Sequence, residues 1–124
     1  MSGVHKFIRE DGQYRWEDIE GEKIKDEGID SVVKHVLIGP KDKAPNMIMR
    51  YFHVGPKGHS RLERHPHEHE IIVLHGQGTV QIADSLIPLK AMDVVFIEGN
   101  ELHQFSNIGE EDFGFICMIP ANTQ

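Results

Sequence analysis

The sequence predicts an all-β fold, a sandwich or barrel of short strands. Apolar runs rich in valine, isoleucine and phenylalanine recur from residue 31 onward, at a spacing of roughly 8–12 residues. Glycine, proline, asparagine or aspartate separates these runs and marks the turns between them. No segment shows the apolar period of an amphipathic helix. Together these three observations favour an antiparallel all-β domain.

The first thirty residues differ in character from the rest of the chain. They are polar and charge-rich, and their aromatic residues, including Tyr14 and Trp16, are irregularly spaced. Because such a segment cannot build a core of its own, we expect residues 1–30 to form an N-terminal arm that wraps the barrel or a partner subunit. Within this arm, residues 16–21 are expected to form either one turn or an edge strand.

The expected strands of the main domain follow in order along the chain. They cover residues 32–38, 47–54, 69–74, 79–82, 86–89, 93–97, 102–105 and 113–119. Gly39-Pro40 ends the first of them, and the glycine- and proline-rich residues 55–58 end the second. Gly76-Gln77-Gly78 offers the positive-φ positions of a tight turn, so we expect residues 71–74 and 79–82 to pair as a hairpin.

Length, charge and cysteine content narrow the class of protein. A chain of 124 residues fits one domain, which we place at residues 31–120, with residues 121–124 as a tail. A net charge of −7 argues against a nucleic-acid partner. The apolar runs are too short for a membrane helix, and the N-terminus lacks the apolar stretch of a signal peptide. The single cysteine suits a reducing compartment, so we expect a cytoplasmic protein without membrane partners.

A cluster of histidines and carboxylates within residues 62–76 is the centre of the functional prediction. Its members are Glu63, His65, His67, Glu68, His69 and Glu70. Imidazole nitrogen and carboxylate oxygen suit first-row divalent metals. Glu63 and His65 would leave the same face of a strand. Pro66 would then turn the chain so that His69 starts the next strand opposite them. A histidine-rich tract can also be a solvated loop or a weak metal sink, but the two-residue spacing between strand-like segments favours a specific site.

Two motifs resemble those of the cupins, small jelly-roll barrels. The first runs through Gly58, Glu63-Arg64-His65, His69 and Gly76, and His103 and Asn107 match the second in identity and spacing. The resemblance covers residues from about 36 to 120 and implies a cupin double-stranded β-helix. It also implies that Glu63, His65, His69 and His103 are the metal ligands. Relative to the commonest cupin pattern, a histidine and a glutamate have exchanged places at 63 and 69.

The same resemblance implies a cofactor and an assembly. The chain is similar to the manganese-binding cupins of bacteria and to cupin-type methylsulfurylases, through runs such as residues 50–54 and 58–65. We therefore expect one divalent transition metal ion, Mn, Fe, Ni or Zn, with Mn and Zn as the leading candidates. Cupins commonly pair through their sheets, so we expect a homodimer, with Ile116 and Met118 of the last strand as candidate contacts.

The lone cysteine, Cys117, has two interpretations. If Phe113, Phe115, Cys117 and Ile119 form one strand face, that face is apolar enough for the barrel interior, and a buried free cysteine is normally inert packing. The alternative is a catalytic thiol whose pKa a nearby cation lowers, acting as a nucleophile or redox group.

Further side chains are candidates to contact a substrate. His59 and Arg61 share the strand parity of Glu63, which would place them at the mouth of the barrel. Arg50 either holds an anionic ligand from inside or forms a surface ion pair. His67 is expected to be a turn residue or to support a metal ligand rather than to be one.

Two classes of function stay open from the sequence. The first is a metal-dependent enzyme of dioxygenase, isomerase or lyase type, acting on a small organic substrate inside the barrel. The second is a non-catalytic cupin that binds or senses a small molecule around a structural metal. Because the four implied ligands include no thiolate, they suit an open catalytic site better than a closed structural one.

Overall fold

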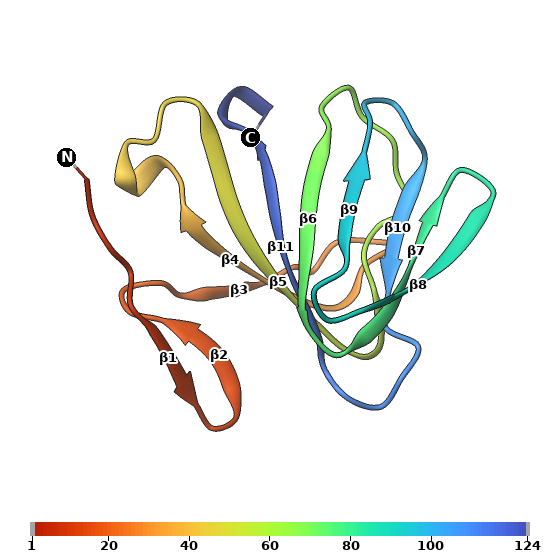
Figure 1. Cartoon of the computed structure of the whole chain (residues 1–124), viewed down its shortest axis with the longest axis horizontal. Coiled ribbons are helices and arrows are strands. Elements are labelled where there is room, and N and C mark those ends of the chain that lie inside the picture. Colours follow the sequence, from red (N-terminus) through yellow and green to blue (C-terminus); the bar gives the residue numbers. More distant parts are fainter. Residues whose placement is uncertain (1, 124) are drawn as a thin grey trace.

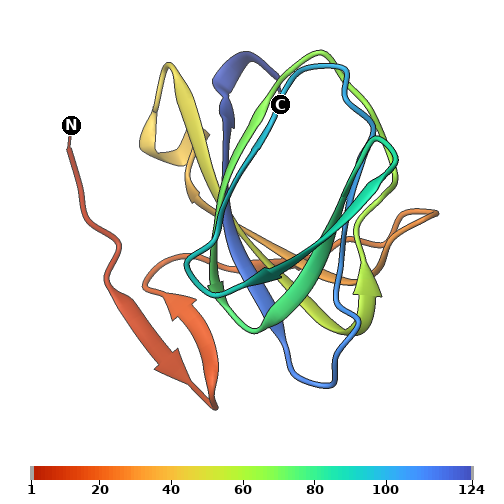
Figure 2. The same cartoon turned by 45° about the vertical axis from the view of Figure 1, so that its right-hand side comes forward.

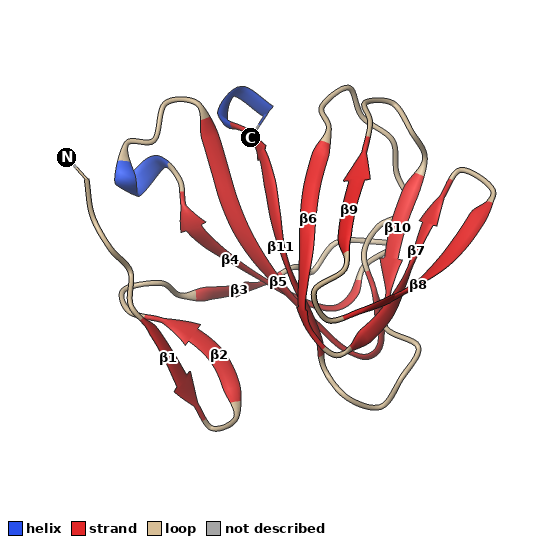
Figure 3. Ribbon diagram, viewed as in Figure 1, coloured by secondary structure: helices blue, strands red, loops and turns tan. Residues whose placement is uncertain are grey.

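The structure, a computed structural model, describes residues 2–123, and nearly all of its regular secondary structure is antiparallel strand. Met1 and Gln124, the outermost residues of the expected arm and tail, lie outside the described residues. The strands are β1 (Phe7–Glu10), β2 (Gln13–Trp16), β3 (Gly21–Lys23), β4 (Asp30–Ile38), β5 (Met47–His59), β6 (His69–His75), β7 (Gln77–Ile82), β8 (Ser85–Lys90), β9 (Val94–Ile97), β10 (His103–Ser106) and β11 (Phe113–Pro120), with short 3₁₀ turns at Pro40–Asp42 and Ala121–Thr123 (Figure 3).

One large sheet carries the fold. Its strand order is β8-β7-β10-β5-β11-β6-β9, and β4 pairs with β5 while β3 pairs with β4 (Figure 1). The sheet curls, so that the strands β7, β8 and β10 face β5, β11 and β6 across the interior (Figure 2). A sheet that curls onto itself buries one face and leaves the other outside. The all-β barrel prediction is confirmed.

The core fills the inside of this curl. On β6, Ile71 and Val73 are buried, whereas Ile72 and Leu74, which alternate with them, are half-buried on the outer face, which is the two-residue period of a strand. The inward residues of the other strands join them in one cluster: Val32, Ile48, Val54, Val80, Leu89, Val95, Ile97, Phe105, Phe113, Phe115, Cys117 and Ile119. Full burial of a side chain of this size contributes about 1.5–3 kcal/mol.

The hairpin expected between residues 71–74 and 79–82 is wrong. β6 pairs with β9 and β11, whereas β7 pairs with β8 and β10, so the chain crosses from one wall of the curl to the other at Gly76. Gly76 does adopt a positive φ of 78°. A side chain there would collide with the carbonyl oxygen of Asp112. The glycine therefore permits a close backbone approach rather than a two-residue turn.

The second expected strand extends beyond residue 54. β5 continues through residues 55–58 to His59, where it pairs with both Asp30 and Ser106. Its register against β4 shifts between Asp30 and Val32, which accommodates Pro56 and the positive φ of Lys57. A glycine- and proline-rich stretch can thus mark a bulge within a strand instead of its end.

The N-terminal segment folds into strands of its own. β1 and β2 form a separate two-stranded hairpin, at the left of Figure 1. Trp16 ends β2 and residues 17–18 form a turn, so the turn expected in residues 16–21 is present, followed by β3 on the edge of the main sheet. The hairpin packs its aromatic residues against the outer face of the sheet, with Trp16 5.1 Å from Tyr51 between ring centroids. No helix in residues 2–123 is long and apolar enough to cross a membrane.

Candidate metal centre

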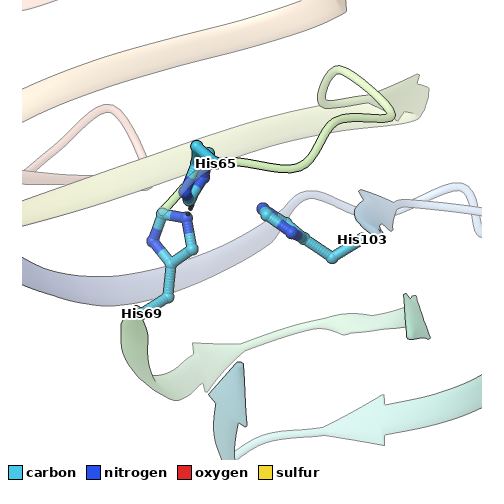
Figure 4. A group of neighbouring side chains, drawn as sticks. All are labelled: His65, His69 and His103. Atoms are coloured by element: carbon cyan, nitrogen blue, oxygen red, sulfur yellow. Dashed lines mark hydrogen bonds between the residues drawn. The ribbon is translucent and has the colours of Figure 1, made fainter. Parts of the chain in front are cut away.

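Three histidines from separate parts of the chain converge inside the curled sheet. His65 lies in the segment between β5 and β6, His69 is the first residue of β6, and His103 is the first residue of β10. One nitrogen from each ring lies within 4.8 Å of the others, and the Nε2 atoms of His65 and His69 are 2.9 Å apart. Figure 4 shows the three rings pointing toward one another. Convergence of this kind is what a metal site requires.

Backbone hydrogen bonds hold these residues in register. Glu63 and His103 form an isolated bridge, in which the Glu63 N–H donates to the His103 carbonyl at 3.1 Å and the reverse bond is 2.9 Å. The Asn100 N–H donates to the His65 carbonyl at 2.6 Å. Asn100 has a φ of 67°, a left-handed conformation that asparagine tolerates well. The segments that carry the two motifs are therefore joined through the main chain.

Each imidazole is fixed by its other nitrogen. His65 Nδ1 lies 2.9 Å from the His67 carbonyl oxygen, and His103 Nδ1 lies 2.9 Å from the Glu101 carbonyl oxygen. A carbonyl only accepts, so both Nδ1 atoms carry the proton and both Nε2 atoms carry a free lone pair. His69 Nδ1 contacts the Cys117 Sγ at 3.0 Å. This is the support that metal-binding histidines usually have.

The residues fit a divalent cation. If the Nδ1 proton of His69 is donated to sulfur, the lone pairs of the His65 and His69 Nε2 atoms face each other, an arrangement that a shared cation relieves. Burial, with the positive charges of neighbouring histidines and Arg50, lowers the pKa of His69 to about 3. The ring is therefore neutral over the physiological range, as a ligand must be. The three described histidines thus form a candidate centre for one divalent metal ion, as the sequence predicted.

Glu63 lies beside this group but outside it. Its Oε1 atom is 3.9 Å from His65 Nε2, and its side chain is 40% exposed. Among residues 2–123, the cluster with metal-ligand spacing contains the three histidines alone. The regular strand expected for Glu63 and His65 is reduced to the single bridge at Glu63, because the chain bends at Pro66 and His67. Its part as the fourth ligand stays a prediction.

His67 packs on the site without joining its nitrogen cluster. Its ring stacks on that of His65, with centroids 3.7 Å apart and planes 8° from parallel, and its carbonyl accepts the bond from His65. Burial, with the charge of His65, lowers the pKa of His67. The residue therefore contacts His65 and faces the cavity beside it, and its supporting role stays a prediction.

A cavity of about 380 Å³ opens next to the three histidines. The inward side chains of β4, β5, β10 and β11 line it, together with residues of β3 and the neighbouring loops. Its apolar wall includes Phe52, Phe105 and Phe115, and the Phe105 and Phe115 rings stack 4.6 Å apart. Glu63, His65, His67, His69, His103, Arg50 and Cys117 also face it. The volume suits a small organic molecule.

Cys117 combines the two interpretations that the sequence left open. It is 2% exposed and belongs to the apolar core, yet its Sγ contacts both His69 Nδ1 and an Arg50 Nη atom, the latter at 3.1 Å. Burial raises the pKa of the thiol, and the adjacent guanidinium opposes that rise. Cys117 is thus a core residue in direct contact with a candidate metal ligand. Its catalytic role stays a prediction.

The remaining candidates lie at different depths. Arg61 lines the mouth of the cavity, where its guanidinium is 3.7 Å from the Asp26 carboxylate. The His59 side chain contacts the neighbouring backbone, with Nδ1 3.1 Å from the Ser60 carbonyl oxygen, and His59 is not among the residues that line the cavity. Arg50 points inward, so the surface ion pair considered from the sequence is wrong. Lys34 and Glu22 also line the cavity, although no sequence pattern singled them out.

The curled sheet and the convergent histidines define a class of small β-barrel proteins with a metal centre inside the barrel. The chain belongs to the cupin domain family, whose family model matches residues 50–119. The matched region spans β5 to β11 and contains every residue of the candidate centre.

Relatives of known name fall in the same family. The chain is 38% identical over 112 residues to 1-methylthio-D-xylulose 5-phosphate methylsulfurylase from Rhodospirillum rubrum, covering 88% of this chain and 70% of that protein. It is 31% identical over 103 residues to (S)-ureidoglycine aminohydrolase from Escherichia coli, covering 82% of this chain and 39% of the enzyme. A crystal structure of a cupin-2 domain protein from Rhodospirillum rubrum superposes with a TM-score of 0.81 at 37% identity, covering 88% of this chain and 74% of that one.

Proposed function

We propose that this chain is a metal-dependent enzyme of lyase type that acts on a small organic substrate inside the barrel. The observation that carries the proposal is the convergence of His65, His69 and His103 beside a cavity of about 380 Å³. A structural metal site is normally closed by its ligands, whereas a site that faces a cavity leaves room for a substrate.

The metal of this proposal is a divalent transition ion, with manganese or zinc preferred over iron and nickel. When bound, such an ion supplies Lewis-acid polarisation of a substrate oxygen. Histidine nitrogen with one carboxylate oxygen accommodates any of these metals. Glu63 is the proposed fourth donor, because its carboxylate lies 3.9 Å from His65 Nε2 and reaches the same cavity.

The relatives favour an enzyme, and one residue favours lyase chemistry. The named relatives are a methylsulfurylase and an aminohydrolase. Cys117 supplies a thiol to the same cavity, where Arg50 and His69 hold its sulfur in place. We assign it the role of a nucleophile whose sulfur would bond to the substrate carbon as the bond from that carbon to the heteroatom breaks, the heteroatom leaving with the electron pair and the thiol proton. Loss of a proton from the neighbouring carbon would then form a double bond and restore the thiol, which is a net elimination.

The test begins with the metal. Protein purified from its own host should contain about one divalent ion per chain, and His69→Ala should contain almost none, because it removes one of three nitrogen ligands. His5→Ala is the matched control, since His5 pairs with Asp42 on another part of the surface. Elemental analysis measures both. A wild-type protein without metal, or a His69→Ala variant with full metal content, would overturn the proposed centre.

The second stage is turnover. A panel of thioether-substituted ketose phosphates, ureido acids and dicarbonyl compounds should contain a substrate whose cleavage stops on chelation and returns with metal. Cys117→Ala should then keep its metal and lose most of its rate if the thiol is the nucleophile. Metal bound at one ion per chain without turnover of any compound would instead support a non-catalytic cupin that binds or senses its ligand.

We also propose that the chain forms a homodimer through the outer face of the sheet. Val94 and Phe96 on β9 are 75% and 59% exposed. The register places Val94, Ile72 and Ile116 in one outward row, next to a row of Phe96, Glu70 and Met118, in which Glu70 is the one charged residue. Such an apolar sheet face is typical of an interface. Sedimentation of the wild type and of Phe96→Asp, which should be monomeric, tests this assembly.

A further inference from the structure

A guanidinium group lies inside the cavity without an anion beside it. Arg50 belongs to β5, where Ile48, Arg50 and Phe52 alternate with outward residues and face the interior. Arginine is seldom turned toward a core unless its charge is paired. Among the described residues, no carboxylate lies within 4 Å of Arg50.

Most of the hydrogen-bonding capacity of Arg50 is unused. The group has five N–H donors, and its recorded side-chain bond is the one from an Nη atom to the Cys117 Sγ. The Nε atom is buried and has no hydrogen-bond partner. A buried donor without a partner is unfavourable, and a charged one more so. The Arg50 side chain therefore has free N–H donors for a hydrogen-bond acceptor supplied by a ligand.

The plane of the guanidinium is held in place. The Phe52 ring packs against it, with the Arg50 Cζ 4.9 Å from the ring centroid, and the Cys117 sulfur fixes one Nη atom. A fixed planar guanidinium matches the two oxygens of a carboxylate or phosphate, and forms paired hydrogen bonds to them.

The position of Arg50 relates it to the histidines. Cys117 Sγ contacts an Arg50 Nη atom on one side and His69 Nδ1 on the other, so a single sulfur atom separates the guanidinium from a candidate metal ligand. All three residues face the same cavity. One small molecule can therefore contact the guanidinium and the histidine centre together.

The other charges of the cavity lie nearer its mouth. Arg61 pairs with Asp26, and both side chains are substantially exposed, at 44% and 65%. Glu22 is exposed and Glu63 is 40% exposed, whereas the Nε atom of Arg50 is buried. Lys34, half-buried on β4, is a second cation of the lining. The deep end is thus cationic, although the lining as a whole carries both signs.

We infer that Arg50 binds the anionic group of the substrate, a carboxylate or a phosphate, while another oxygen of the same molecule faces His65, His69 and His103. This inference rests on the proposed function, since it places the substrate in the same cavity. It narrows the substrate class to small organic acids and phosphate esters. The cavity volume of about 380 Å³ suits a molecule of this size.

The test measures anion binding separately from metal binding. Oxalate and inorganic phosphate are titrated calorimetrically into wild type, Arg50→Gln, Arg50→Lys and Arg61→Gln, each with and without one equivalent of Mn²⁺. Arg50→Gln should keep its metal and bind the preferred anion about 10- to 100-fold more weakly, because a charge-assisted pair is lost. The anion affinity of Arg50→Lys should lie between those of the wild type and Arg50→Gln. Arg61→Gln should change the anion affinity less than about threefold, since exposed ion pairs contribute little.

The two anions distinguish the two chemistries, because oxalate reports a carboxylate site and phosphate reports a phosphate site. If Arg50→Gln does not fold, as judged by circular dichroism, Arg50→Lys decides, since it keeps the charge and loses the paired geometry. Wild-type affinity for both anions in the folded variant, or no binding of either anion to wild type, overturns the inference. A wild-type protein that binds no metal is a separate result, which contradicts the proposed function. In that case the anion affinities measured without Mn²⁺ decide the inference about Arg50.

Discussion

The two faces of the curled sheet each carry a group of histidines, and the groups are arranged in opposite ways. Inside the curl, His65, His69 and His103 bring one nitrogen each within 4.8 Å of the others. On the outer face, the histidines are dispersed among other partners. Tyr51 pairs with His75 at 2.5 Å, His53 lies 2.9 Å from an Asp112 oxygen, and Arg15 bonds His35 at 3.3 Å.

The difference shows what separates a metal centre from a structural histidine cluster. In the inner group the Nδ1 atoms are held by acceptors and the Nε2 atoms point at one another, so the free lone pairs converge. In the outer group each ring faces a different phenol, carboxylate or guanidinium, and the N-terminal hairpin covers the set with Tyr14, 4.3 Å from His75 between ring centroids. The two faces carry similar numbers of histidines, but only in the inner group do the ring nitrogens converge in a way that suits a bound cation.

The largest expected effect is the gain in stability on metal binding, which should depend on the inner histidines and not on the outer ones. Excess Mn²⁺ or Zn²⁺ should raise the free energy of unfolding of the wild type by ~4 kcal/mol at a free concentration about 1,000-fold above Kd. His103→Ala should lose this increment, because one of three nitrogen ligands is gone. His75→Ala should keep it in full, whatever its own stability. Urea denaturation with and without metal measures the increment, and equal increments in the two variants would abolish the distinction.

A smaller effect is expected in the packing of the outer group. Gly114 lies on β11 directly beneath Tyr51 and His75, and a Cβ there would collide with the Tyr51 hydroxyl and the His75 ring. Gly114→Ala should therefore lower the free energy of unfolding by about 1–3 kcal/mol, as overpacking does. Gly109→Ala is the control, since its Cβ would meet only ordinary contact with Asn107. Thermal unfolding of both variants tests the assignment, and a neutral Gly114→Ala would show that the outer pair is loosely held.

The smallest expected effect is the part that the outer histidines play in the pH dependence of the metal-free protein, to which the inner His69, with its lowered pKa, also contributes. Burial lowers the pKa of His35 and of His75 below the ordinary value of 6.5. The unfolded chain then binds protons that the folded chain refuses, so the free energy of unfolding should fall as the pH is lowered below about 6.5. His5 acts in the opposite sense, because its bond to Asp42 raises its pKa and stabilises the fold below that pH. Denaturation at pH 7.5 and 5.5 gives the sign, and a weaker dependence in His35→Gln would assign it.

The sequence allowed much of the inner site to be predicted. The sequence identifies His65 and His69 because ligand-type residues close together beside strand-like runs are a local signal, whereas His103 is identified only through the resemblance to the second cupin motif. Strand positions were also largely correct from Ser85 onward, where turn residues bound each run. These features depend on neighbours in the chain, which a sequence displays directly.

The errors concern pairing across the chain. The sequence could not show that β6 pairs with β11 and not with β7. A glycine in a tight hairpin turn and a glycine that lets two backbone segments approach closely have the same local sequence, and only the contact of Gly76 with Asp112 distinguishes them. The same pairing sets Cys117 opposite Ile71 and so brings its sulfur to His69, 48 residues away. The outer histidine group was missed for the same reason, since its members are spread over β4, β5 and β6 with no common motif.

The bridge between Glu63 and His103 has a consequence for how this scaffold can diversify. Its two bonds run between main-chain atoms and are indifferent to the side chains they carry. The side chain at position 63 can consequently change between an acid and an imidazole while the backbone bridge stays in place. A change of the ligand side chain, and with it of the preferred metal ion, therefore requires substitutions but no change of fold.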